Sequence, residues 1–244
     1  MEINRHNSQL NETELPSAEN AFEWPRQAMR EQNWSEATQR WAVLRKAYPN
    51  HPATWFQGAI AHIEAGELQQ AKNLLKQARQ QFPNHPNLLI SFATLYMRKQ
   101  EWNVAEDLLR RARENHSDNA QTWMKSAEYA EGLKNIEQAG KYYQKACEIS
   151  PNLQGPFIQH AELAMRNEQW EQASERWKIL RDHFPKNPAG YHRAAEAAQK
   201  LNQPKEARKL ILAQQYGSDI FEDNKHKKNH PETITKINTP HTNI

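Results

Sequence analysis

The sequence predicts an all-α protein, built as a solenoid of six consecutive helix–turn–helix units. The first observation is a series of alanines that recurs every 34 residues over most of the chain. The second is the composition, since only 37% of the 244 residues are hydrophobic, which is little for one large core. A solenoid needs a smaller fraction of hydrophobic residues, because its packing is divided among small interfaces between neighbouring units. No run of apolar residues approaches the roughly 18 that a transmembrane helix needs, so no membrane insertion is expected.

Two series of small residues, each with a large side chain four positions away, define the repeating unit. In the first half of each unit an aromatic residue or leucine precedes an alanine, as Trp55 precedes Ala59 and Leu89 precedes Ala93. In the second half the alanine comes first. These alanines are Ala37, Ala71, Ala105, Ala139, Ala173 and Ala207, followed by Trp41, Leu75, Leu109, Tyr143, Trp177 and Ile211. Spacings of three and four share one helical face, so we expect two helices that approach closely at the alanines.

Proline residues indicate where each second helix ends, since proline does not continue a helix. Pro49, Pro83 and Pro185 occupy equivalent places. The six units are 18–51, 52–85, 86–119, 120–153, 154–187 and 188–221. We expect 18–221 to form one solenoid domain, after a polar extension at 1–17 and before a disordered polar tail at 222–244. Pro25 stands where later units have alanine, so the first helix of unit one is expected to be short or kinked.

The pattern resembles the tetratricopeptide repeat, a 34-residue helix–turn–helix unit. Residues Trp55 to His62, Ala71 to Leu75, and Pro83 match it position by position. The resemblance covers 18–221 and implies a right-handed superhelix whose first helices line a concave groove. The alternative fold is the related half-repeat of RNA-processing proteins, which the two small-residue series do not favour. The Arg–Trp style of units one and five is also similar to arrays that accompany bacterial glycosyltransferases and envelope-polysaccharide proteins.

The resemblance implies that positions two, five, six, nine, twelve and thirteen of each unit face the groove. Methionine and other apolar residues gather at positions five and twelve, and methionine adapts to varied apolar ligands. The expected anchors are Phe56, Ile60, Ile63, Ile90, Met97, Met124, Ile158 and Met165. The charged residues expected to set register and specificity are Glu128, Glu162, Arg166 and Arg193. The alternative is that the position-twelve side chains only fill the space between neighbouring first helices.

No catalytic, cofactor or metal site is expected. Glu128, Glu162 and Glu196 lie one unit apart, and packed helices are roughly 8–10 Å apart. Two carboxylates that share a proton need about 3 Å, so a salt-bridged polar face is the simpler interpretation. Cys147 has no base at a fixed spacing, and the few glycines form no phosphate-binding loop.

We therefore expect a non-enzymatic, cytoplasmic scaffold or adaptor that binds a peptide segment of another protein. The formal net charge of +3 is too small to indicate nucleic acid or a membrane, and the N-terminal 20 residues contain no signal-like apolar stretch. The alternatives are an accessory factor for envelope polysaccharide assembly or secretion, the non-catalytic part of an enzyme, and an RNA-binding helical-repeat protein. Aspartate at Phe56 and Ile90 is expected to abolish partner binding and to leave the melting temperature nearly unchanged.

Overall fold

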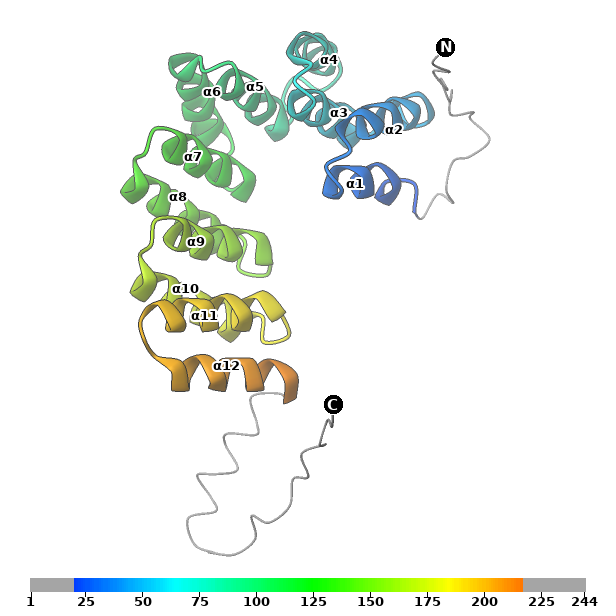
Figure 1. Ribbon diagram of the computed structural model, residues 1–244. Coiled ribbons are helices and arrows are strands. Elements are labelled where there is room, and N and C mark those ends of the chain that lie inside the picture. The colour runs from blue at the N-terminus through cyan, green and yellow to red at the C-terminus, as the bar shows by residue number, and fades with distance from the viewer. Residues whose placement is uncertain (1–19, 217–244) are drawn as a thin grey trace, which may run out of the picture. The chain divides into compact units, whose positions relative to one another are not determined.

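A computed structural model describes residues 20–216, and this range contains twelve α-helices and no β-strand (Figure 1). The helices form consecutive pairs. They are α1 Glu23–Arg30, α2 Trp34–Ala47, α3 Pro52–Glu64, α4 Leu68–Gln81, α5 Pro86–Arg98, α6 Trp102–Asn115, α7 Ala120–Gly132, α8 Ile136–Ile149, α9 Gln154–Arg166, α10 Trp170–His183, α11 Pro188–Lys200 and α12 Pro204–Tyr216. The first helices of pairs two to six begin at intervals of 34 residues, as the alanine series predicts. The all-α array of helix pairs is therefore confirmed.

The packing divides the chain into two compact units, one that ends at Pro156 and one that begins at Phe157. The first contains α1 to α8, and the second contains most of α9 and all of α10 to α12; each is described here by itself. A single solenoid domain over 18–221 stays a prediction. The extension at 1–17 and the tail at 222–244 lie outside the described residues. None of the helices within 20–216 is long and apolar enough to cross a bilayer.

The helix ends follow from local side-chain chemistry. Proline at the first helical position starts α3, α5 and α11, where its missing N–H costs nothing. The rings of His51 and His85 cap α3 and α5, because Nδ1 of each accepts a hydrogen bond from the backbone two residues on, at 3.3 and 3.2 Å. Pro25 falls in the first turn of α1, which is only 8 residues long, so the prediction of a short first helix is confirmed.

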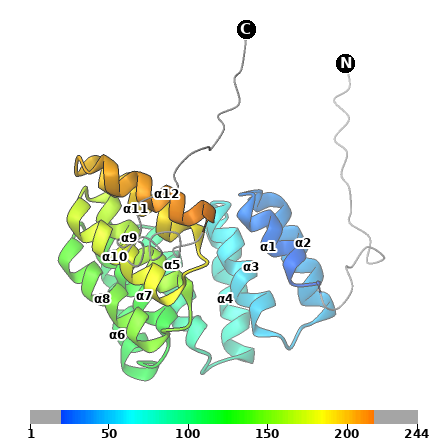
Figure 2. The same cartoon turned by 90° about the horizontal axis from the view of Figure 1, so that it is seen from below.

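The repeated alanines are buried between the helices. Ala37, Ala71, Ala105, Ala139 and Ala173 are completely buried, and Ala207 is 2% exposed. The bulky residues of the same series are also buried, apart from Ile211 on the last helix. In the first compact unit α1 lies beside α2 and α3 lies beside α4 (Figures 1 and 2). Trp41 fills the space between Ala28, Ala37 and Ala61, which shows how small and large residues pack together.

Candidate peptide-binding surface

Four of the eight predicted anchors are buried in the protein core rather than facing a groove. The exposed fractions are 1% for Phe56, 0% for Ile63, 7% for Ile90 and 5% for Met165. The ring of Phe56 stacks on His85 at 4.7 Å between centroids and lies 6.2 Å from Phe82. The prediction that these four side chains face a partner is wrong. At Ile63 and Met165, the position-twelve side chain fills the core, as the alternative interpretation proposed.

The other four predicted anchors are half-buried, so part of each side chain is accessible. Ile60, Met97 and Met124 belong to the first compact unit and stand on α3, α5 and α7. Ile158 stands on α9 in the second unit. Ile60 packs one side against the buried cluster around Phe56, which fixes its orientation. These residues are the apolar part of the candidate surface that the structure leaves accessible.

The predicted charged residues are largely engaged with each other. In the second unit, Arg193 of α11 makes two hydrogen bonds to the carboxylate of Glu162 on α9, at 2.7 and 2.6 Å, and also pairs with Glu196. The hydrogen bonds that Arg193 donates to Glu162 raise the pKa of the Arg193 guanidinium, so this side chain stays charged. In the first unit Lys125 pairs with Glu128 along α7. The expected salt-bridged face is confirmed for these pairs. Arg166 is exposed on α9.

A further cross-helix ion pair was not predicted. Arg98 at the end of α5 donates to Glu64 at the end of α3, with Nη2 and Oε2 2.5 Å apart. The two residues occupy the thirteenth position of successive repeats. The pair therefore ties neighbouring first helices together at the edge of the candidate surface.

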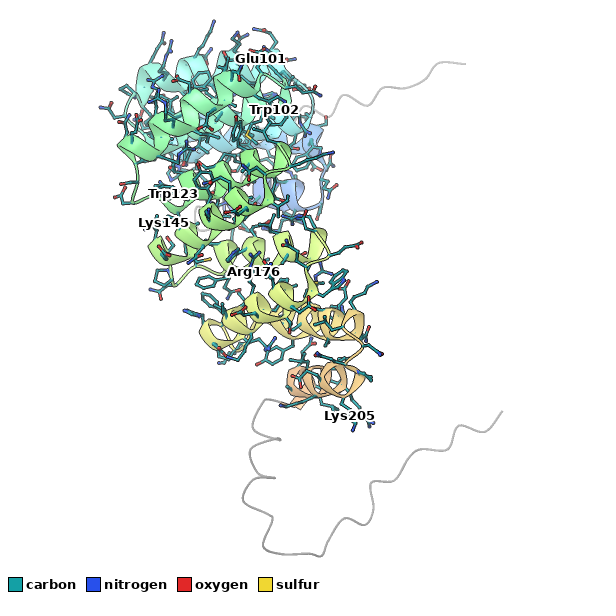
Figure 3. All side chains as sticks on the ribbon, turned by 90° about the vertical axis from the view of Figure 1, so that its left-hand side faces the viewer. Glu101, Trp102, Trp123, Lys145, Arg176 and Lys205 are labelled. Atoms are coloured by element: carbon teal, nitrogen blue, oxygen red, sulfur yellow. The ribbon has the colours of Figure 1, made fainter. Side chains whose placement is uncertain are left out.

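His160 of α9 has a structural role. Burial, helped by the positive charge of Arg176, lowers the pKa of His160 to about 4. Arg176 of α10, which Figure 3 labels, donates a hydrogen bond to the backbone carbonyl of His160 at 2.9 Å. The imidazole is thus neutral at neutral pH and forms part of the packing between α9 and α10. Within the described range, no group of three or more His, Cys, Asp or Glu side chains is placed to hold a metal ion.

A pocket of about 460 Å³ lies where α4, the turn after it, α5 and α6 meet. Its apolar lining includes Leu89 and Leu108, and arginines Arg79 and Arg111 stand at it from α4 and α6. Sequence reasoning missed this pocket. The signal was present, because Leu89 is the leucine in a series otherwise filled by Trp55, Trp123, Phe157 and Tyr191.

Comparison with known proteins agrees with this architecture. Models of the tetratricopeptide repeat match residues 62–129 and 120–153. No curated protein sequence matches the chain. The fold is similar to that of yeast Tom70, with a TM-score of 0.61 and 16% identity over 80% of this chain and 45% of that one. It is also similar to Pseudomonas aeruginosa PilF, with a TM-score of 0.51 and 13% identity over 83% of this chain and 95% of that one. A structure of Naa15/Naa10 bound to HypK-THB is similar too, with a TM-score of 0.53 and 15% identity over 74% of this chain and 26% of that one.

At sequence identities of 13–16%, these structural similarities show the fold alone. The sequence matches, however, fall on the helix pairs in which the repeated alanines are buried. The periodic sequence, the twelve paired helices and the family models all point to one repeat. The chain therefore belongs to the tetratricopeptide-repeat proteins.

Proposed function

We propose that the protein is a non-enzymatic, cytoplasmic adaptor that binds a peptide segment of another protein along its first helices. The observation that carries the proposal is the set of half-exposed apolar side chains on those helices, Ile60, Met97 and Met124. A thioether side chain adapts its shape to the ligand, so methionine suits a surface that accepts an apolar peptide. Ile158 offers a comparable contact in the second compact unit.

Charged residues beside these apolar groups support recognition of a particular peptide. Arg193 is held by bidentate hydrogen bonds to Glu162. Its side chain therefore loses little conformational entropy when a partner binds. Glu128 keeps 43% of its side chain exposed although it pairs with Lys125. A partner that carries charges of the opposite sign at matching positions would gain affinity here, and a partner with like charges would be rejected.

The comparisons support a protein partner in general terms. The Naa15/Naa10 structure, which has a similar fold, is of a complex with HypK-THB. Helical repeats expose long surfaces, because each unit contacts only its neighbours and leaves one face of its helices accessible. A peptide that lies along several first helices would therefore meet a chemically graded surface rather than a single pocket.

The test is an affinity pull-down with mass spectrometry, followed by binding measurements on peptides from the captured protein. The variant is Met97→Asp combined with Met124→Asp, and the matched control is Val104→Asp on α6, a second helix. Val104 is 42% exposed, so aspartate is tolerated there. We expect the double variant to weaken peptide binding by at least about tenfold, because charge replaces apolar contact at two sites.

Circular dichroism melting keeps the result interpretable. The double variant should remain folded at the temperature of the binding assay, since both methionines are partly exposed. Unchanged peptide binding in the double variant, or an equal loss in Val104→Asp, would show that the first helices are not the binding surface.

A further inference from the structure

The third repeat lacks an aromatic contact that the neighbouring repeats use to close the turn before their first helix. In the second and fourth repeats the indole N–H of Trp55 and Trp123 donates to the carbonyl six residues earlier, of Pro49 and Ser117, at 2.7 and 2.8 Å. Figure 3 marks Trp123 on α7. Leu89 holds the equivalent place in α5 and has neither a ring nor a donor. The carbonyl of Pro83 therefore receives no indole hydrogen bond, and Pro83 lines the pocket.

Asn115, which is shorter than the glutamine at the equivalent position of the second repeat, also lines the pocket. In the second repeat, Gln81 reaches back to the preceding turn and donates to the carbonyl of Pro49 and to the side chain of Asn50, both at 3.0 Å. The equivalent residue of the third repeat is Asn115, which is one methylene shorter. Its side chain makes no hydrogen bond within residues 20–216, and it lines the pocket.

The pocket has the size and the floor of a binding site. Its volume of about 460 Å³ falls in the range of about 300–1,000 Å³ that is typical of ligand sites. Leu88, Leu89, Phe92 and Leu108 supply apolar surface. In the fourth repeat, the place of Leu89 and Leu108 is taken by Trp123 and Tyr142, whose ring centroids are 5.8 Å apart. The third repeat thus leaves empty a space that aromatic rings fill elsewhere in the chain.

The missing ring also leaves an arginine without its usual partner. Arg45 lies 5.5 Å from the ring of Trp55, and Arg181 lies 5.7 Å from the ring of Tyr191. Arg79 occupies the equivalent position on α4, but it makes no hydrogen bond, ion pair or ring contact within the described residues. Arg111 comes no nearer than 4.0 Å to its one carboxylate neighbour, Asp107. Both guanidinium groups are therefore available to an anionic ligand.

No acidic residue lines the pocket, so its charge is uniformly positive or neutral. His85 and His116 stand beside the two arginines. Burial, together with the electrostatic interaction with His116, lowers the pKa of His85, so this ring stays neutral at neutral pH. An apolar floor with cationic groups above it favours a ligand that combines an aromatic ring with negative charge.

We propose that this pocket binds an aromatic side chain, flanked by acidic residues, from a partner protein. The ring enters the space that Trp55 and Trp123 fill in their own repeats, and Arg79 stacks on it as Arg45 stacks on Trp55. The neighbouring carboxylates pair with Arg79 and Arg111. The pocket shares no lining residue with the candidate first-helix surface, so this inference stands apart from the function proposed above.

The experiment measures binding of the full chain to a fluorescein-labelled peptide with one tryptophan between two pairs of acidic residues. One companion peptide has alanine in place of tryptophan, and another has amides in place of the carboxylates. The protein variants are Leu89→Trp, Arg79→Gln and Arg111→Gln. The matched control is Arg110→Gln, which changes the same charge on the same helix but lies outside the pocket and pairs with Asp107 and Glu114 instead.

We expect each companion peptide to bind at least about tenfold more weakly than the acidic tryptophan peptide. Leu89→Trp should abolish binding, because the chain's own ring then occupies the pocket, while Arg110→Gln should bind like the wild type. Arg79→Gln and Arg111→Gln should each weaken binding by about three- to tenfold and reduce its dependence on salt. Arg79 is exposed and unpaired, so its variant tests the proposal even if Leu89→Trp fails to fold.

Three results would overturn the proposal. The first is equal binding of the tryptophan and alanine peptides, or no binding at millimolar peptide. The second is unchanged binding in both Leu89→Trp and Arg79→Gln. The third comes from a labelled single-stranded RNA, which also combines aromatic rings with anions. The pocket takes nucleotides rather than a protein side chain if the RNA binds to the wild type, if Leu89→Trp abolishes this RNA binding, and if the peptide does not compete with the RNA.

Discussion

Replacing Phe56 by alanine should cost the protein a large part of its stability. The side chain is 1% exposed and lies in the cluster that also contains Leu74, Leu75 and Leu88. Removing a buried phenylalanine ring typically costs about 3–5 kcal/mol, because the lost contacts are not recovered by collapse of the cavity. The stacked contact with His85 at 4.7 Å adds to this loss. We expect a decrease of about 4 kcal/mol in the free energy of unfolding.

Urea unfolding followed by circular dichroism measures this change. The matched control is Ile60→Ala, one helical turn further along α3, where the side chain is only half-buried at the edge of the same cluster. Because the Ile60 side chain is only half-buried, the free energy of unfolding should fall by about 1 kcal/mol in this control. A Phe56→Ala cost below about 1 kcal/mol, equal to that of Ile60→Ala, would refute the assignment of Phe56 to the core and revive its role as an exposed anchor.

Two further predictions concern titration and close packing. The pKa of His160 is about 4 in the folded chain against 6.5 in the unfolded one, so the unfolded state binds more protons between these values and stability falls as the pH drops below 6.5. From pH 7 to pH 5 the loss should be about 2 kcal/mol in urea unfolding, and His160→Gln should remove this part of the slope; an unchanged slope would contradict it. Gly132→Ala should destabilise the protein by about 1–3 kcal/mol and shift its tryptophan fluorescence, because the added Cβ would lie 2.8 Å from the ring of Trp102. Gly155→Ala is the control, since nothing lies within 4 Å of its Cβ and the change should be neutral or slightly stabilising; equal effects of the two would show that the Trp102 ring yields freely.

The sequence alone was sufficient for the helix pairs, because their determinants are local and periodic. A residue such as Ala71 repeats every 34 positions with Leu75 one turn later, and this spacing fixes the shared face of a helix without knowledge of its neighbours. Both side chains are completely buried. The short α1 was predictable for the same reason, since Pro25 restricts the backbone wherever it occurs.

Exposure at the candidate surface was not predictable, because it depends on which side chains of other elements pack against each position. Phe56 and Met124 both stand at position five. Phe56 is covered by Phe82, whereas the equivalent of Phe82 in the fourth repeat is Ser150, a residue too small to cover Met124. The periodic pattern assigns both residues to one face of a first helix. In the fifth repeat Phe184 stands where Phe82 does, yet Ile158 is half-buried, so several neighbours together decide how far that face is buried.

A repeat protein creates a pocket most simply by leaving out a side chain that its other repeats retain. Arg45 and Arg181 each lie against the aromatic ring at position four of the next repeat, so one substitution at that position removes a ring and also frees the arginine that it would have engaged. The presence of Leu89 instead of an aromatic residue therefore explains both the pocket and the unpaired Arg79. Two unrelated surface features would have no reason to coincide at one turn. The departure of a single repeat from the pattern, rather than the pattern itself, thus indicates where this chain differs in function from a plain helical array.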